Sequence, residues 1–213
     1  MKKIILIIIV CACFTLSCNS IPRNIKNAYT YCHANTYTGI DTLINIEGYY
    51  SNSMMFYDNG LVIANNSMSL FSDMTTLFSN EIAADFETKD MKLFYNLINC
   101  GKYVICGDTI KVQMIHKSYS INDSWHGREK WYKIVDKNTI RFLDWFLITT
   151  NQKEKKLWRK NYPIPAEEGA KSTFVPMPTK PPLDHYWILK EKWFWCNEQD
   201  WKDYMEKMKQ KKK

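Results

Sequence analysis

The segment KYVICGDTIKVQMIH, residues 102–116, decides the fold class of this chain. Two β-prone runs flank the pair Gly107–Asp108, and glycine tolerates the backbone geometry that a tight hairpin turn requires. In the second run Ile110, Val112 and Met114 alternate with polar residues. A period of two is typical of an antiparallel strand with one buried face. The segment therefore predicts a β-hairpin that presents an apolar face to a core.

Two other segments have the same character. Residues 54–64, MMFYDNGLVIA, and residues 130–143, KWYKIVDKNTIRFL, each contain a turn sequence between β-prone runs, so each predicts a further hairpin. The segments WFLITT, residues 145–150, and KKLWRK, residues 155–160, are expected to supply another pair of strands. Together these patterns predict an antiparallel meander of about six to eight strands.

The C-terminal part of the chain differs in composition. Residues 163–182 hold six of the seven prolines, and proline lacks the N–H that a sheet ladder needs. This segment is therefore expected to form neither strand nor helix, but an extended strap or a linker. Asn197 is expected to cap a following helix, with Asp200 at the position of a capping acid.

The expected C-terminal helix is amphipathic. Its apolar stripe has the spacing i, i+3, i+4, i+7 and consists of Trp201, Tyr204, Met205 and Met208. We expect this stripe to pack on the domain. The alternative is a helix that lies on a membrane surface, because its polar face is rich in lysine. Residues 205–213 contain five lysines and one glutamate, so most of the net charge of +7 lies in this tail.

The N-terminus has the features of a secretory signal. Lys2 and Lys3 precede an apolar run, Ile4–Leu16, that is too short for an ordinary membrane span of about 20 residues. The run ends at Ser17 and Cys18, and this ending resembles the lipobox of bacterial lipoproteins. The resemblance implies cleavage between Ser17 and Cys18 and lipidation of Cys18, which would anchor the chain to a membrane. An ordinary cleaved signal and an uncleaved anchor are the alternatives.

Cysteine use fits an exported chain. Of seven cysteines, two leave with the signal and Cys18 takes the lipid, so four remain: Cys32, Cys100, Cys106 and Cys196. Exported compartments permit disulfides, and four cysteines allow three pairings. Six residues of strand span about 20 Å, so Cys100 and Cys106, on one predicted strand, cannot reach each other. Whether the four cysteines form bridges or remain thiols stays open.

The motifs GKYVICGDTI, residues 101–110, and YKIVDKNTI, residues 132–140, resemble those of the small lipocalin-like barrels found in many bacterial lipoproteins. The resemblance covers residues 46–150. It implies a mainly β fold, in which an antiparallel meander forms a small lipocalin-like barrel, followed by a proline-rich strap and a C-terminal α-helix. It also implies a lipid-anchored protein of the cell envelope, in the outer membrane of a Gram-negative bacterium. The resulting organisation is a signal peptide at 1–17, a lipidated tether at 18–45, the barrel at 46–160, and the strap and helix with its lysine tail at 161–213.

No motif of a known catalytic or metal site occurs in the sequence. The four histidines lack metal-ligand spacing, and there is no C-x-x-C, G-x-S-x-G, Walker or G-x-G-x-x-G sequence. His116 is expected to continue the inward face of Ile110, Val112 and Met114, whereas Cys106 is expected to point outward, so these two do not form a catalytic pair. We therefore predict no catalytic residue, no cofactor and no metal.

Two aromatic-rich stretches are candidate binding surfaces. The first, SWHGREKW at residues 124–131, gathers Trp125, His126, Arg128 and Trp131 into a candidate binding patch. Aromatic residues and arginine are enriched where proteins bind partners. The alternative is aromatic packing over a barrel end, with the charges outward.

The second stretch is WFWC, residues 193–196. Trp193, Phe194, Trp195 and Trp201 are expected to form either a lid over one barrel mouth or an interface with a membrane or a protein. The lid is favoured, because the apolar stripe of the following helix must also be buried.

These features favour a non-catalytic binding module for a small apolar ligand or for an envelope protein. An eight-stranded barrel has room for side chains or for one small ligand. One alternative is a structural subunit of an envelope complex that docks through the C-terminal extension. Another is an envelope hydrolase without a recognisable motif. Nucleic acid is not expected as a partner, because the chain is predicted to be exported.

Overall fold

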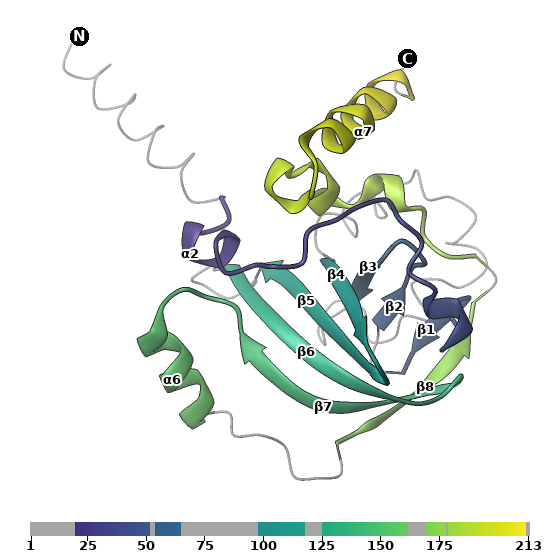
Figure 1. Cartoon of the computed structure of the whole chain (residues 1–213), viewed down its shortest axis with the longest axis vertical. Helices are drawn as coiled ribbons and strands as arrows, with labels where there is room; N and C mark the ends of the chain where they lie inside the picture. The colour runs from purple at the N-terminus through teal and green to yellow at the C-terminus, as the bar shows by residue number, and fades with distance from the viewer. Residues whose placement is uncertain are drawn as a thin grey trace, which may run out of the picture.

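The computed structural model describes residues 20–51, 54–64, 98–117, 125–161, 169–177 and 179–211. Its strands form one closed antiparallel barrel, in which each strand pairs with its neighbours in the chain and the last pairs with the first (Figure 1). This confirms the predicted mainly β, lipocalin-like barrel with a C-terminal helix. The strands are β1 (Gly48–Tyr50), β2 (Met54–Phe56), β3 (Leu61–Ala64), β4 (Asn99–Cys106), β5 (Thr109–Lys117), β6 (Trp125–Asp136), β7 (Thr139–Leu147) and β8 (Lys171–Pro176).

The three predicted hairpins are present as β2–β3, β4–β5 and β6–β7. Gly60 and Gly107 turn the chain with φ angles of 85° and 61°, a region that residues with a Cβ rarely adopt. In the third turn the backbone N–H of Asn138 donates to the carboxylate of Asp136. All three turns lie at the same end of the barrel, which we call the turn end; the opposite end is the loop end.

Side chains fill the barrel interior toward the turn end. The predicted inward residues Ile110, Val112 and Met114 belong to this core and are at most 2 % exposed. Aromatic rings from β1, β2 and β4 pack edge to face among them. Some of the aromatic residues of the chain therefore fill this half of the barrel.

The described part of the predicted tether, residues 20–45, packs against the barrel. The 3-10 helix η1 (Ile40–Thr42) and the residues after it place Ile40 and Ile44, both fully buried, in the interior core. Backbone hydrogen bonds on either side of η1 join it to the β2–β3 and β6–β7 turns. Helix α2 (Arg23–Lys26) packs Ile25 on the outer wall against Ile115. The apolar residues of this segment are widely spaced and follow no regular period, so the interpretation of residues 18–45 as a tether did not anticipate that they pack on the barrel.

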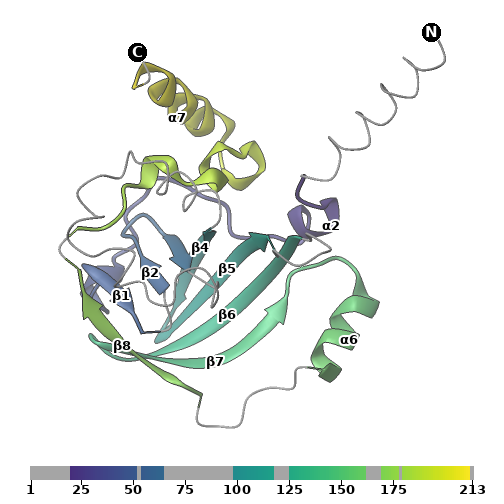
Figure 2. The same ribbon diagram turned by 180° about the vertical axis from the view of Figure 1, so that it is seen from behind.

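A second core lies on the outer wall of the barrel. Here the segment after β8, residues 179–196, covers the outward side chains of β1–β4; we call it the outer-wall segment and this core the outer-wall core. Tyr186, Ile188 and Phe194 of this segment are at most 1 % exposed. The segment passes along the barrel on its way to α7 (Glu198–Gln210), as the front and back views show (Figure 1, Figure 2). Because β2 and β3 are buried on both faces, their sequences do not alternate between apolar and polar residues. The segment contains the 3-10 helices η2 (Leu183–His185), η3 (Trp187–Lys190) and η4 (Lys192–Phe194).

The predicted proline-rich strap contains the last barrel strand. β8 pairs with β1 and with the start of β7, so it closes the barrel. Residues 171–175 contain no proline, and Pro176 stands at the last position of the strand, where a missing N–H is tolerated. The predicted boundary at residue 160 was therefore wrong, because the prolines flank this strand instead of interrupting it.

The predicted strand at residues 155–160 is instead part of helix α6 (Gln152–Asn161). The side-chain oxygen of Asn151 accepts hydrogen bonds from the backbone N–H groups of Lys153 and Glu154, which caps the helix. Asn151 followed three residues later by Glu154 is a capping-box pattern that the strand prediction overlooked. The segment WFL at the start of the predicted partner strand does belong to β7.

A disulfide joins the two ends of the described chain. Cys32 pairs with Cys196 across 164 residues of sequence, whereas Cys100 and Cys106 are free. The prediction that Cys100 and Cys106 do not pair with each other is confirmed. Beside the bridge, a parallel backbone pairing connects His33 with Trp195. The bridge therefore fastens the outer-wall segment to the N-terminal segment.

Helix α7 begins as predicted, because the side chain of Asn197 accepts a hydrogen bond from the backbone N–H of Gln199. Its apolar stripe is only half-buried. Trp201 donates its indole N–H to the Lys190 carbonyl, and Tyr204 donates its hydroxyl to the Asp184 carbonyl. The stripe thus packs on the outer-wall segment. Among the described residues, no helix combines the length and the apolar character needed to cross a membrane.

Candidate ligand-binding site inside the barrel

The inner face of β5 and β6 changes character toward the loop end. Directly opposed residues of an antiparallel pair share one face of the sheet. Lys130 therefore points inward with its partner Val112, and Arg128 points inward with Met114. The next inward pair is His116 and His126, whose ring centroids are 5.3 Å apart. The register thus confirms that His116 continues the inward face, and it shows an apolar core giving way to basic side chains.

Two tryptophans complete this cluster. Trp145 of β7 lies opposite Lys130 and shares its face. Trp158 of α6 packs edge to face on Trp145, with 4.9 Å between the ring centroids. The guanidinium carbon of Arg128 lies 5.2 Å from the Trp145 ring centroid and 5.3 Å from that of Trp158. The arginine is therefore held by cation–π contacts to two rings.

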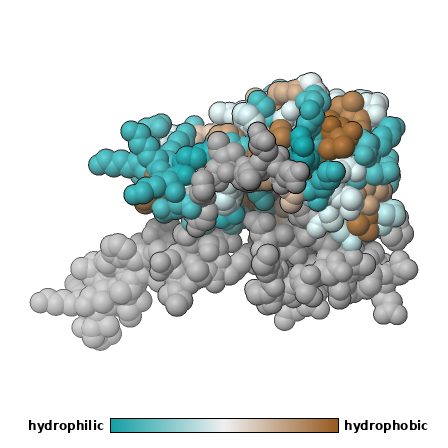
Figure 3. All heavy atoms as spheres, turned by 90° about the horizontal axis from the view of Figure 1, so that it is seen from below, coloured by the Kyte–Doolittle hydropathy of each residue, from teal (hydrophilic) through white to brown (hydrophobic). Residues whose placement is uncertain are grey.

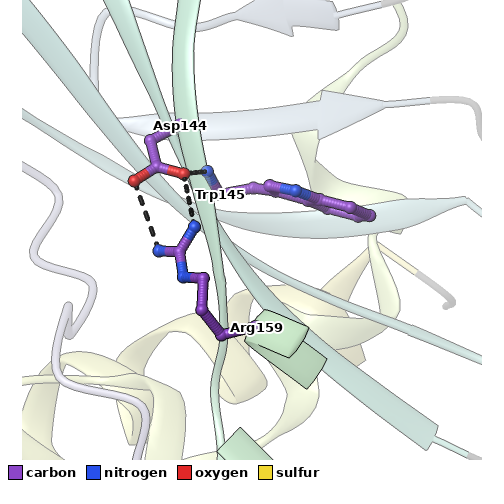
Figure 4. A network of polar contacts seen from close by, with 3 residues as sticks. All are labelled: Asp144, Trp145 and Arg159. Atoms are coloured by element: carbon purple, nitrogen blue, oxygen red, sulfur yellow. Dashed lines mark hydrogen bonds and ion pairs between the residues drawn. The ribbon is translucent and has the colours of Figure 1, made fainter. Parts of the chain in front are cut away.

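An ion pair on the outer side of β7 anchors helix α6, which carries Trp158. Arg159 donates two hydrogen bonds to the Asp144 carboxylate, at 3.0 and 3.3 Å, and Asp144 also accepts one from the backbone N–H of Trp145 (Figure 4). In Figure 4 the side chains of Asp144 and Trp145 extend to opposite sides of the strand. Since β8 pairs with β7 only at residues 139–141, α6 lies beside the remainder of β7. Figure 3 shows a hydrophilic surface on the α6 side of the molecule.

Burial shifts the titration of these groups. Burial, and secondarily the charge of Arg128, lower the pKa of Lys130 to about 8. Burial, followed by the charges of Arg128, His126 and Lys130, lowers the pKa of His116 to about 3. The pKa of His126 is also lowered, by burial and then by Arg128, while Glu154 opposes the shift. At pH 7 the cluster therefore presents two cations, from Arg128 and Lys130, beside two neutral imidazoles.

The predicted binding patch does not exist as one surface. Its four residues all lie on β6, where successive side chains point to opposite faces. His126 and Arg128 face the interior, whereas Trp125 and Trp131 lie on the outer wall. Trp125 packs there against Trp187, and Trp131 packs against Phe146 and donates its indole N–H to Glu129. The prediction was wrong because it treated a continuous strand as a loop and a strand edge.

The predicted lid over a barrel mouth was also wrong. Phe194 is fully buried in the outer-wall core, and its neighbours Trp193 and Trp195 pack on Tyr29 and His33. Trp201 lies on α7. These aromatics cover a wall because the strands beneath them, β1–β4, expose apolar side chains outward as well as inward.

Lys130, Trp145 and Trp158 did not emerge from the sequence as site residues. The signal for Lys130 was present, since His126, Arg128, Lys130 and Tyr132 follow one another at a period of two in β6. No sequence pattern places Trp158 beside Trp145, because that contact depends on where α6 docks. Comparison with known proteins finds no matching family model, no similar curated protein and no similar solved structure.

Proposed function

We propose that this protein is a lipid-anchored, non-catalytic binding protein of the bacterial cell envelope, and that its barrel receives a small molecule at the loop end. The observation that carries the proposal is the inward-facing set of Arg128, Lys130 and Trp145, on which Trp158 of α6 packs. Placing charged groups inside a protein costs desolvation free energy and contributes little to packing. Arg128 and Lys130 are partly shielded from solvent, and burial lowers the pKa of Lys130 to about 8. Titratable groups with perturbed pKa values cluster at functional sites, which supports a binding role.

The filled interior limits the size of the ligand. Side chains occupy the barrel toward the turn end, and η1 closes that end with Ile40 and Ile44. A ligand is therefore confined to the loop-end half, beside the basic and aromatic side chains. An eight-stranded barrel of this kind accommodates one small molecule.

Binding can be tested with a neutral apolar fluorophore, N-phenyl-1-naphthylamine, and with two matched variants. Trp145 faces the interior and Trp131 faces outward on the neighbouring strand. We expect Trp145→Ala to weaken binding of the fluorophore and Trp131→Ala to leave it unchanged. Native mass spectrometry of the protein extracted from the envelope should also show a bound small molecule. A protein that binds neither the fluorophore nor any co-purified molecule would contradict the binding proposal.

The membrane anchor can be tested by intact mass. The chain produced with its own signal and extracted from membranes should have the mass of residues 18–213 plus acyl chains, and Cys18→Ala should abolish both cleavage at this site and membrane retention. A mature protein without acyl chains, released in soluble form, would refute lipid anchoring. It would not contradict the proposed binding site.

A second role, docking to an envelope partner through α7, is favoured by the projection of this helix away from the barrel (Figure 1). Deletion of residues 161–213 would not test it, because that change removes β8. Truncation after Cys196 retains the disulfide and the outer-wall core. If this shorter chain keeps its melting temperature and loses a partner that co-purifies with the full chain, docking through α7 is supported. If the same partner stays bound, docking through α7 is refuted.

A further inference from the structure

We infer that helix α6 docks on an anionic membrane surface through an exposed face of three lysines and one leucine, so that the side of the barrel that carries α2 and α6 faces the bilayer. This face, which we call the lysine face, consists of Lys153, Lys156, Leu157 and Lys160. The inference rests on the proposed lipid anchor at Cys18, and it specifies which surface of the anchored protein contacts lipid head groups.

The connection between the proposed anchor and the barrel is short. Ile21 is buried and packs with Ile25 and Ile115 on the outer wall. Cys18 precedes Ile21 by three residues, which span at most about 11 Å when fully extended. The Debye length at 0.1 M salt is about 10 Å. Charged groups on the wall around α2 are therefore held close enough to anionic head groups to be attracted by them.

Helix α6 begins beside α2. The side-chain amide of Asn24 in α2 donates a hydrogen bond to the Thr149 hydroxyl at 2.9 Å, and the Asn24 carbonyl accepts one from the backbone N–H of Thr150. The first residue of α6, Gln152, follows two positions later, and the helix is about 15 Å long. The front and back views both place α2 and α6 on the same side of the barrel (Figure 1, Figure 2). The short connection therefore also holds α6 near the membrane.

The lysine face points away from the barrel. Its members have the spacing i, i+3, i+4, i+7, which places them on one side of the helix. Trp158 packs on Trp145 of the barrel. It is two positions from both Lys156 and Lys160, so it points roughly 160° away from them around the helix axis. The three lysines are exposed, and Leu157 is 59 % exposed.

The charge of the lysine face is not neutralised by the part of the protein that the structure describes. None of its three lysines forms an ion pair with a described residue. Glu154, the single acid of α6, accepts a hydrogen bond from the buried Thr149 hydroxyl, so it is directed toward the barrel. Arg159 is paired with Asp144. Anionic head groups supply the missing negative charge, and each lysine near such a surface increases affinity about fivefold.

Leu157 favours a lipid surface over other anionic partners. A helix that lies on a membrane combines lysines with apolar side chains that enter the boundary between head groups and acyl chains. Leu157 lies on the same exposed side of α6 as the three lysines. A lipid surface therefore accommodates both the charge and the apolar side chain of this face.

The first test uses the protein extracted from the envelope with its acyl chains and reconstituted into vesicles. The rate at which N-hydroxysuccinimidyl acetate acetylates each lysine is measured by mass spectrometry. One set of vesicles contains phosphatidylcholine alone, and the other contains equal parts of phosphatidylcholine and phosphatidylglycerol. We expect Lys153, Lys156 and Lys160 to react about fivefold more slowly in the anionic vesicles. Lys137 and Lys171 are exposed near the turn end and should react at the same rate in both.

The second test uses the mature chain, residues 18–213, with Cys18→Ser, which carries no acyl chain and reports the protein surface alone. It should sediment with phosphatidylglycerol vesicles but not with phosphatidylcholine vesicles, and 1 M salt should abolish binding because the Debye length falls to about 3 Å. The double variant Lys156→Gln/Lys160→Gln should lower the partition coefficient about twentyfold. Lys137→Gln/Lys171→Gln removes the same charge elsewhere and should change it less than about twofold. Both variants should keep the melting temperature, because all four side chains are exposed.

The two tests separate this inference from the anchor on which it rests. Equal acetylation of the lysine face in both kinds of vesicle, or equal effects of the two double variants, would overturn the inference and leave the lipid anchor standing. An acidic protein would then be the better candidate for this face. An intact mass without acyl chains would refute the anchor, and the second test would still decide whether α6 binds anionic lipid.

Discussion

Loss of the Cys32–Cys196 bridge should strongly destabilise the protein. The bridge ties the N-terminal segment to the segment that covers β1–β4, and these two segments also pair through His33 and Trp195. The double variant Cys32→Ser/Cys196→Ser removes the bridge without changing the buried aromatic side chains around it. The expected result is a large loss of unfolding free energy.

The magnitude follows from the length of the closed loop. The two cysteines are 164 residues apart, and the chain-entropy relation gives about 5 kcal/mol for a loop of that length at 25 °C. Native disulfides in exported domains typically contribute about 2–5 kcal/mol. We therefore expect a loss of about 2–5 kcal/mol, concentrated in the outer-wall segment because that segment loses its attachment first.

Urea unfolding followed by tryptophan fluorescence measures this loss. Cys106→Ser is the control, because Cys106 is free and exposed, and it should change the unfolding free energy by less than about 0.5 kcal/mol. The unchanged protein in a reducing buffer should behave like the double variant. A difference below about 1 kcal/mol between the bridged and unbridged forms would refute the reasoning, since even the low end of the expected range exceeds it.

Three other perturbations test separate parts of the structure. Burial lowers the pKa of His33 from 6.5 to about 3, so the unfolded chain takes up a proton at a higher pH than the folded protein does. The free energy of unfolding should therefore fall as the pH drops from 6.5 toward 3, by at most about 1.4 kcal/mol per pH unit. Thermal melts in acid should show a smaller slope for His33→Phe. Gly101→Ala would place a Cβ in steric overlap with the Gln113 carbonyl oxygen, so thermal melts should show a loss of more than about 2 kcal/mol. Asp144→Asn should weaken its pairing with Arg159 by about 1 kcal/mol and increase hydrogen exchange in α6 before the rest of the barrel; unchanged exchange in α6 would contradict the proposed anchoring.

Local chemistry was sufficient to predict the hairpins. Gly60 and Gly107 determine the conformation of the turns that contain them, because each adopts a positive φ. The alternation of Ile110, Val112 and Met114 depends only on the pleat of one strand. The cap at Asn197 is equally local. These features determined the antiparallel meander and the start of the last helix, and they also identified the inward face that includes His116.

Only the tertiary structure decided which side chains meet. Residues 171–176 form a strand because β1 and β7 offer open edges with which they can pair. Cys32 bonds with Cys196 because two segments that are distant in the sequence cross the same wall of the barrel. The candidate site likewise requires the register of β6 with β7 and the docking of α6, which bring Lys130, Trp145 and Trp158 together from three elements. Local sequence determines the conformation of each strand and turn, whereas contacts between distant segments arise from the apolar surfaces left uncovered once those strands have paired.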